Sequence, residues 1–241
     1  MGGSADLGGD REVTAQMWLR SMSAVFLKEV RTEWRSRVAV LSVGLFALCS
    51  LTLIGLSLAG MRATPEVAAG LLWILTLFTA ATGLGRVFVQ EEERGTSLAL
   101  RLSAPGTAVW TGKFAANAVL LSVLAALSTP LLLMILGVKV ANPVLLFCVS
   151  ILGVIGTAAT FTTMAALVAL SSSKGGLLAA LSFPVLVPLF LAAIHGTKAA
   201  LGVGNAGGAF AAGAGDVQVL FSYAVIAITA SILLFDFVWG D

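Results

Sequence analysis

The side chains best placed to do chemistry form one charged segment between two long apolar runs. The segment extends from Arg86 to Pro105, and Glu91–Glu93 are followed directly by Arg94, Gly95 and Thr96. Ionised side chains are costly in hydrocarbon, so this segment must lie in water or against a protein partner. The chemistry that we expect of it is recognition, at a docking site on a membrane face.

The docking segment carries the local signals of a short helix. Gly95 ends an incoming helix at low cost, and Thr96 or Ser97 can cap a new one. The stretch Ser97–Leu102 would then form about two turns, and Pro105 suits the first turn of the helix that follows. A solvated turn, whose charges only keep the helix ends out of lipid, is the alternative interpretation.

Motifs for nucleotide or metal chemistry are absent from the sequence. There is no Gly-rich loop ending in Lys-Ser/Thr, so an ATPase that works with this protein must be a separate chain. Cys49 and Cys148 lie inside apolar runs and are expected to be packing residues. We therefore expect no catalytic residues, no metal site and no bound cofactor in this chain, and no nucleic-acid partner.

The elements that hold the docking segment are expected to lie in a membrane. Of the 241 residues, 59% are hydrophobic and only 11% are charged, whereas charged residues make up about 25% of soluble domains. The mean hydropathy is +1.02. This composition predicts an all-α integral membrane protein, and its spans leave no room for a large soluble domain.

Six segments are apolar enough and, at about 20 residues or more, long enough to cross a bilayer as helices. They are Val38–Ala59, Val67–Val89, Ala108–Leu136, Pro143–Leu170, Leu177–Ile194 and Val217–Trp239. The docking segment joins the second span to the third. Residues 1–17 are polar and Gly-rich and are expected to be a disordered tail, and residues 18–241 a single transmembrane domain.

The distribution of basic residues predicts the orientation of these spans, because cytoplasmic loops carry an excess of Lys and Arg. With the N-terminus inside, the inner segments hold eleven: Arg11, Arg20, Lys28, Arg31, Arg35, Arg37, Arg86, Arg94, Arg101, Lys113 and Lys174. The outer segments hold only Arg62, Lys139 and Lys198. Both termini and the docking segment are therefore expected in the cytoplasm.

The stretch from Trp18 to Arg37 predicts an amphipathic helix ahead of the first span. Its apolar side carries Trp18, Met22, Val25, Phe26, Val30 and Trp34, and Arg20, Lys28, Arg31 and Arg35 fall mostly on the other side. Such a helix lies in the membrane interface. It is either a plain anchor or an elbow helix that also touches a cytoplasmic partner.

Three features of the later spans have open interpretations. Pro184 and Pro188 each remove a helix hydrogen bond, which suits a moving gate or a static kink. Gly153 and Gly156 make a close-packing face for a partner helix or for another helix of this chain. The Gly- and Ala-rich stretch 196–216 is expected to be an outer loop that holds a short re-entrant or surface helix.

Parts of the docking segment match a known pattern. Arg86-x-Phe88, Glu93-Arg94-Gly95-Thr96, Ser103-Ala104-Pro105 and Gly112-Lys113 resemble the motif of ABC-2-type permeases. The small-residue fourth span and the two prolines of the fifth are also similar to this family, nearest to its haem exporter protein B branch (CcmB) of the cytochrome c maturation system. The resemblance covers about residues 20–240. This sequence departs from the family pattern in one respect: the acidic residue usual soon after Gly-Thr is absent, because Ser97 to Arg101 contains no carboxylate.

The resemblance implies that the docking segment is a cytoplasmic coupling helix between spans two and three, which meets the ATPase. The residues that it assigns to this interface are Arg86, Phe88, Glu91, Glu92, Glu93, Arg94, Gly95, Thr96, Leu98 and Leu102. His195, the only histidine, is expected to be an interfacial polar residue, with axial ligation of haem as the alternative.

The function implied is that of a permease subunit in the inner membrane, in a complex for haem export and cytochrome c maturation. The implied partners are a cytoplasmic ABC ATPase that binds ATP, a haem-handling membrane protein, a small membrane subunit and the lipid bilayer. ATP hydrolysis would drive helix rearrangement and release of the haem-loaded chaperone. The alternatives are an ABC-2 exporter of a drug, lipid or polysaccharide, and a secondary transporter or membrane scaffold.

Overall fold

The computed structural model describes residues 6–36, 38–58, 60, 62–84, 100, 104–169, 177–204 and 209–240. Within them the chain forms helices joined by turns, and no strand is present. The helices are α1 (Asp6–Ser36), α2 (Val38–Leu58), α3 (Pro65–Leu84), α6 (Gly106–Leu136), α7 (Pro143–Ala169), α8 (Leu177–Ala200) and α9 (Ala209–Gly240).

Six of the described helices, α2, α3, α6, α7, α8 and α9, are long and apolar enough to cross a membrane. The shortest of them, α3, has 20 residues, which is about 30 Å and matches the hydrocarbon thickness of a bilayer. The expected all-α, six-span fold is therefore confirmed. Five of these helices begin within three residues of the predicted spans. The sixth, α9, begins earlier than predicted.

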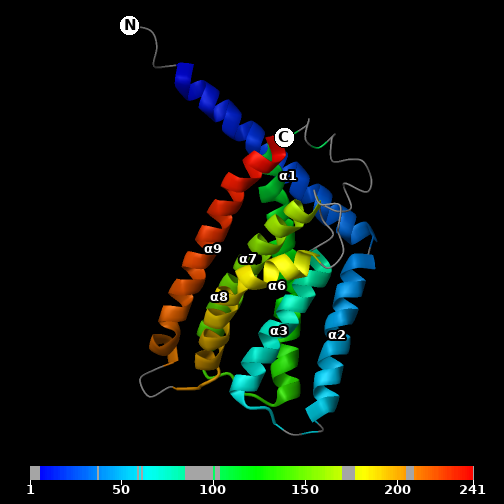
Figure 1. Ribbon diagram of the computed structural model, residues 1–241, viewed down its shortest axis with the longest axis vertical. Coiled ribbons are helices and arrows are strands. Elements are labelled where there is room, and N and C mark those ends of the chain that lie inside the picture. Colours follow the sequence, from blue (N-terminus) through cyan, green and yellow to red (C-terminus); the bar gives the residue numbers. More distant parts are fainter. Residues whose placement is uncertain are drawn as a thin grey trace.

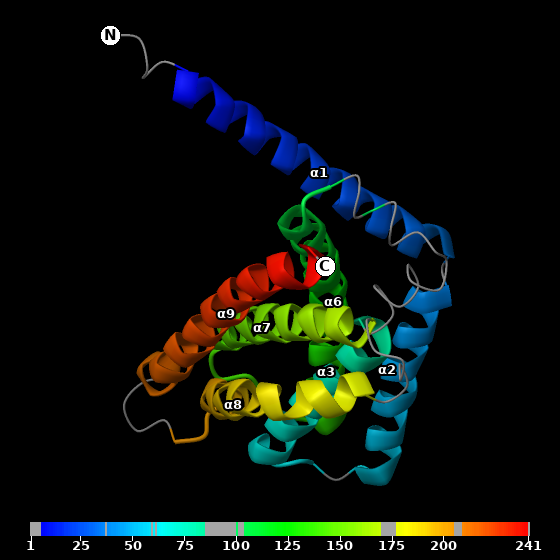
Figure 2. The same ribbon diagram turned by 45° about the horizontal axis from the view of Figure 1, so that its top comes forward.

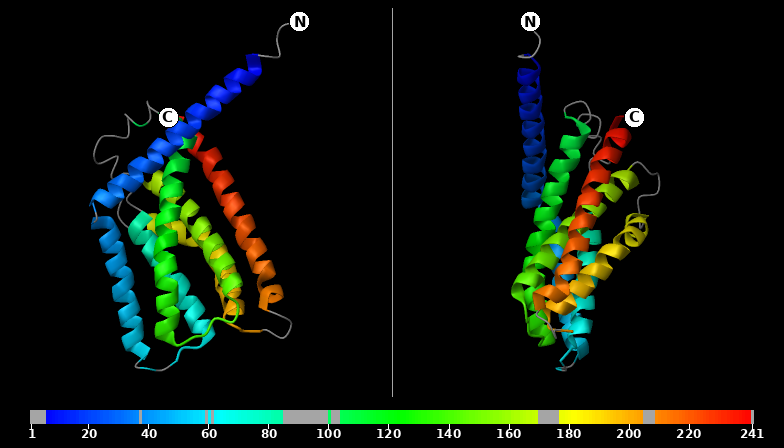
Figure 3. Two further views of the ribbon diagram at one scale, coloured as in Figure 1. Left: turned by 180° about the vertical axis from the view of Figure 1, so that it is seen from behind. Right: turned by 90° about the vertical axis from the view of Figure 1, so that its left-hand side faces the viewer.

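The six spans form one bundle in which α7 lies at the centre (Figure 1). It packs most extensively against α8 and α9, and it also contacts α6 and α3, while α2 packs on α3 and α6 at the edge. The first helix, α1, crosses one end of the bundle and rests on α6 (Figure 2). The last turn of α9 reaches the same end (Figure 3), which we call the α1 end.

The turn between α6 and α7 shows how the sequence ends and restarts a span. Gly137 closes α6 in the left-handed conformation with φ of 66°, where its lack of a Cβ removes the steric cost. Asn142 then caps α7, because its side-chain oxygen accepts the backbone N–H of Leu145 at 3.0 Å. Pro143 occupies the first helical position, where a backbone N–H would have no acceptor within the helix.

Small residues of α7 set the distance to its neighbours. A Cβ at Gly153 would overlap the ring of Trp73 in α3, and a Cβ at Gly156 would overlap Leu189 of α8. Trp73 also donates its indole N–H to Thr197 of α8 at 2.9 Å. The close-packing face of this span is therefore used within the chain, and the alternative of a partner helix does not apply to these two glycines.

One expectation about helix ends is wrong. No separate helix lies between the fifth and sixth spans in the described part of 196–216, because α8 continues to Ala200 and residues 209–216 form the first turns of α9. Gly213 permits this, since a Cβ there would lie 2.6 Å from Leu145 of α7. The helix α1 begins at Asp6, within the stretch 1–17 expected to be a tail.

Candidate functional site

All ten residues predicted for the coupling interface, which fall between Arg86 and Leu102, lie outside the described residues. Their two attachment points are described. At one, α3 ends with the buried Leu84; at the other, Ala104 donates its backbone N–H to Leu100 at 3.2 Å and α6 begins at Gly106. Beside this second attachment, α1 packs against the first turns of α6.

The contact between α1 and α6 depends on a glycine. A Cβ at Gly112 would lie 2.8 Å from the carbonyl oxygen of Met22 and 2.9 Å from the Cβ of Val25. One turn earlier in α6, Thr107 accepts the indole N–H of Trp18 at 3.0 Å. The apolar side predicted for α1 therefore faces α6 through Trp18, Met22 and Val25, and Val25 is buried there.

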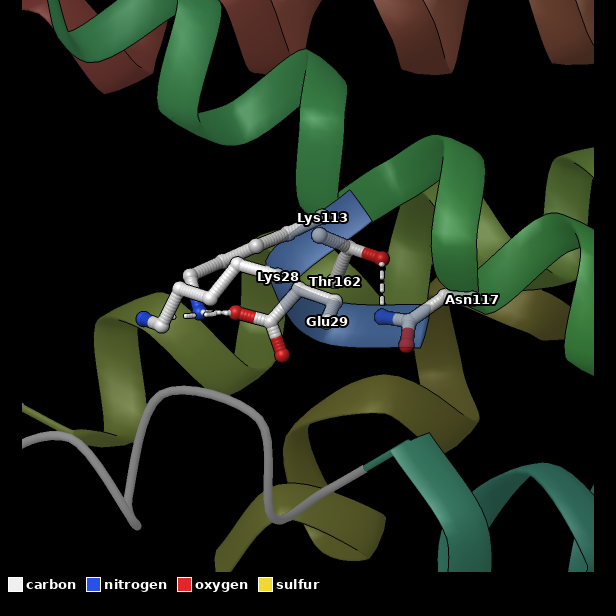
Figure 4. A network of polar contacts seen from close by, with 5 residues as sticks. All are labelled: Lys28, Glu29, Lys113, Asn117 and Thr162. Atoms are coloured by element: carbon white, nitrogen blue, oxygen red, sulfur yellow. Dashed lines mark hydrogen bonds and ion pairs between the residues drawn. The ribbon is translucent and has the colours of Figure 1, made fainter. Parts of the chain in front are cut away.

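A charge pair completes this contact. Lys113, the residue after Gly112, is fully buried, and its ammonium nitrogen lies 2.7 Å from a carboxylate oxygen of Glu29 (Figure 4). The side chain of Glu29 is 17% exposed, and the half-exposed Lys28 lies 3.8 Å from the same oxygen. A buried ammonium group is tolerated only with compensating charge and hydrogen bonds, so this pair specifies how α1 sits on α6.

Further polar contacts continue from this pair into the bundle. Asn117 lies one turn after Lys113 on the same face of α6, and its amide donates to the hydroxyl of Thr162 in α7 at 2.9 Å (Figure 4). Trp110 donates to Thr163, the next residue of α7, at 3.1 Å. The Thr163 hydroxyl lies 2.6 Å from that of Ser231 in α9. Displacing α6 here must therefore disturb α7 and α9.

We call Trp18, Glu29, Thr107, Gly112 and Lys113 the α1–α6 joint. Its groups hold two helices together and have the geometry of neither a nucleophile with its base nor a metal site. Among the described residues, no group of three or more His, Cys, Asp or Glu side chains could hold a metal ion. The joint is therefore suited to passing movement from α1 and the end of the docking segment into the spans.

The two prolines proposed as a gate lie inside α8, which stays helical from Leu177 to Ala200. Pro188 has no N–H to donate to the carbonyl of Pro184, so the helix lacks one bond there. At the next residue, Val185, the backbone carbonyl accepts the hydroxyl of Tyr223 in α9 at 2.8 Å. The Tyr223 oxygen also lies 3.2 Å from that of Thr160 in α7. This weakened stretch of α8 is thus tied to two other spans.

His195 lies toward the opposite end of the bundle from α1. Its side chain is 69% exposed, and its Nδ1 atom lies 2.7 Å from a carboxylate oxygen of Asp216 in α9. A Cβ at the neighbouring Gly196 would lie 3.1 Å from the Cβ of Asp216, so the small residue lets the two helices meet. The contact is that of a polar residue linking two helix ends.

Sequence reasoning identified part of this site. Gly112 and Lys113 were singled out as part of the family motif, and Trp18, Met22 and Val25 as one apolar side. It missed Glu29, Asn117 and Thr162. A signal for them exists, because Lys113 and Asn117 lie four residues apart inside an apolar helix, where polar groups need partners. The identity of those partners depends on packing.

Comparison with known proteins agrees with this arrangement of spans and motifs. No curated protein matches the chain. The model of one protein family, described as CcmB protein, matches residues 20–236, which is nearly the whole chain and spans α1 to α9. The chain therefore belongs to the CcmB family, whose members are haem exporter permeases of cytochrome c maturation and transmembrane subunits of ABC-type complexes.

Proposed function

We propose that this chain converts ATP hydrolysis by a separate cytoplasmic ATPase into a rearrangement of its six spans. That rearrangement would drive release of the haem-loaded chaperone from a haem-handling membrane protein, which works with a small membrane subunit. In this proposal ATP is bound by the ATPase, haem is handled by the other subunits, and this chain binds neither as a resident cofactor.

The observation that carries the proposal is the α1–α6 joint. A force applied to the docking segment enters α6 through Pro105, and a force applied to α1 enters α6 through Glu29 and Lys113, whose charged atoms are 2.7 Å apart. Both routes meet within the first two turns of α6. From there the bond between Asn117 and Thr162, at 2.9 Å, leads to α7 at the centre of the bundle.

The α1 end is placed in the cytoplasm of the cell in this proposal, with the whole chain in the inner membrane. The bias of Lys and Arg supports that orientation, because α1 alone carries Arg11, Arg20, Lys28, Arg31 and Arg35. An even number of spans returns the C-terminus to the same side. The ATPase then meets α1 and Arg86–Leu102 on one face of the membrane.

Pro184 and Pro188 are the proposed moving part of the bundle. A helix that lacks one internal bond bends at lower cost than its neighbours. The contact from Tyr223 to Val185, at 2.8 Å, would be exchanged as α8 changes shape. This step follows the movement of α7, against which α8 packs extensively.

The test uses two substitutions in the docking segment. Glu93→Lys with Gly95→Pro reverses a charge and removes a backbone donor, and we expect the protein to insert but to lose both ATPase binding and cytochrome c maturation. ATPase binding is read by mild-detergent pull-down with mass spectrometry, and maturation by the yield of haem-stained c-type cytochromes. The matched control is Glu93→Asp with Gly95→Ala, which keeps the charge and the N–H.

Normal maturation in the Glu93→Lys, Gly95→Pro variant would contradict the coupling role of the docking segment. Full maturation in cells that lack any ATPase able to bind this chain would contradict the proposal as a whole. A chain that binds an ATPase but supports export of a drug, lipid or polysaccharide in place of maturation would keep the coupling mechanism and overturn the haem assignment.

A further inference from the structure

A cavity of about 300 Å³ lies between α6 and α7, away from the α1–α6 joint. Its rim is formed by residues with exposed apolar side chains, among them Phe147 at 68% exposure. The rest of the wall is mostly Ala, Leu, Ile and Val. In a bilayer such a cavity opens sideways into lipid, because Ala126, Pro130 and Pro143 of its wall are also exposed.

The wall of this cavity carries three hydroxyl side chains. Several Ser and Thr hydroxyls of the described helices donate to a carbonyl of their own helix; examples are Thr52, Ser57, Thr82, Thr111 and Thr157. Ser122, Thr129 and Ser150 line the cavity, and the buried Ser150 hydroxyl has no hydrogen-bond partner among the described residues. A hydroxyl left unpaired in hydrocarbon is costly.

The backbone adds to this polarity. Pro130 lies inside α6 and lines the same cavity, so the carbonyl of Ala126 has no N–H donor in its own helix. The hydroxyl of Ser150, a residue of the α7 side of the cavity, is shielded from solvent. An otherwise apolar membrane face thus carries the hydroxyl donors of Ser122, Thr129 and Ser150, and that of Ser150 has no acceptor among the described residues.

The depth of these donors indicates which acceptor they meet. Thr129 lies seven residues before the end of α6 at Leu136, and Ser150 lies seven residues after the start of α7 at Pro143. Both are therefore about 10 Å from the end of a helix that is about 40–46 Å long. Since hydrocarbon is about 30 Å thick, both hydroxyls lie about 2–6 Å inside its boundary, next to the lipid ester groups.

We propose that this cavity binds one diacyl glycerophospholipid from the leaflet at the end opposite α1. Thr129 and Ser150 donate to an ester carbonyl of the lipid, and one acyl chain runs along the groove past Ser122 and Val154. The ester oxygens accept hydrogen bonds, which suits the hydroxyl donors of the wall. This site does not depend on the coupling function proposed above.

The test uses the full chain in nanodiscs that contain a phosphatidylcholine with a photoactivatable diazirine in one acyl chain. We expect the mass-mapped lipid adducts to concentrate in residues 122–154. Thr129→Val with Ser150→Ala removes the hydroxyls at nearly constant volume and should lower these adducts by about fivefold or more, for two lost hydrogen bonds. Ser150→Leu fills the cavity and should abolish them.

The matched control is Thr52→Val with Ser57→Ala, because these two exposed hydroxyls of α2 already donate to Leu48 and Ile54. It should leave the adducts unchanged. A second measurement needs no substitution: unlabelled diester phosphatidylcholine should compete several-fold better than its diether analogue, which lacks the carbonyl acceptors.

Two outcomes would overturn the proposal. One is an even spread of adducts over all lipid-facing helices, which would mean ordinary annular lipid. The other is equal competition by diester and diether lipids together with unchanged labelling of the Thr129→Val, Ser150→Ala variant. Cross-links from residues 122–154 to a second protein chain in place of lipid would also overturn it.

Discussion

The ammonium group of Lys113, fully buried near the start of α6, lies 2.7 Å from the carboxylate of Glu29 in α1. The two residues are 84 positions apart in the chain, so only the packing of α1 across α6 brings them together. Because a buried charge needs compensation, this pair makes the position of α1 sensitive to either residue.

Removing the charge of Glu29 should loosen α1. We expect Glu29→Gln to lower the free energy of unfolding by about 1–3 kcal/mol, since Lys113 loses an ionic partner in a buried site. Lys28→Gln is the control. The side chain of Lys28 is 47% exposed, and an ion pair formed by so exposed a group contributes only about 0–1 kcal/mol. Thermal unfolding in detergent and protease cleavage within α1 report the two effects. Equal behaviour of the two variants would contradict the role of Glu29.

Gly112 should accept no side chain. A Cβ there would lie 2.8 Å from the backbone oxygen of Met22, and backbone cannot move aside as a side-chain tip can. We expect Gly112→Ala to cost about 1–3 kcal/mol through overpacking. Gly70→Ala in α3 is the control, because nothing lies within 4 Å of its Cβ position, and it should gain up to about 1 kcal/mol of helix stability. If both variants unfold at one temperature, α1 is not held by Gly112.

The approach of α3 to α7 should depend jointly on Gly153 and Trp73. A Cβ at Gly153 would overlap the six-membered part of the Trp73 ring, so Gly153→Ala alone should cost about 1–3 kcal/mol. Trp73→Phe shortens that ring and also removes the N–H donated to Thr197 at 2.9 Å. In that background Gly153→Ala should cost much less, giving a coupling energy of about 1 kcal/mol or more. Additive losses in the double-mutant cycle would refute this packing.

Tyr223 should hold the proline-containing stretch of α8. We expect Tyr223→Phe to remove the hydrogen bond to the Val185 carbonyl and to lower stability by about 0.5–1.5 kcal/mol. Amide hydrogen exchange should rise around Leu186–Leu189, next to Pro188, and stay unchanged in α3. Phe221→Leu, at a 59% exposed position of the same helix, serves as the control. Exchange in α8 that does not respond to Tyr223→Phe would exclude this contact as a restraint.

Much of the fold follows from the sequence. A bilayer admits only backbone whose hydrogen bonds are satisfied internally, so apolar runs of sufficient length become spanning helices, and their number and order are read directly from residues 38–240. Local signals such as Gly137 and Asn142 then end one helix and start the next. The family assignment likewise rests on sequence, because its motifs are local.

Predictions about contacts between helices depended on information that local patterns lack. The small residues Gly153 and Gly156 indicated close packing but not the partner, which Trp73 and Leu189 supply from two other helices. The extension of α9 back to Ala209 was missed because Ala and Gly are weak signals for a span, whereas packing of Gly213 on Leu145 stabilises helix there.

The sequence by itself determined that this is a six-span membrane protein with a charged segment between its second and third spans and the motifs of the CcmB family. Hydrophobic length and charge decide those features, and both are local properties of the chain. Only the tertiary structure decided that Lys113 pairs with Glu29, that Tyr223 bonds α8 beside its prolines, and that Thr129 and Ser150 share one cavity. Each of these relations joins residues of different helices, and the rotation of one helix against another is set by packing.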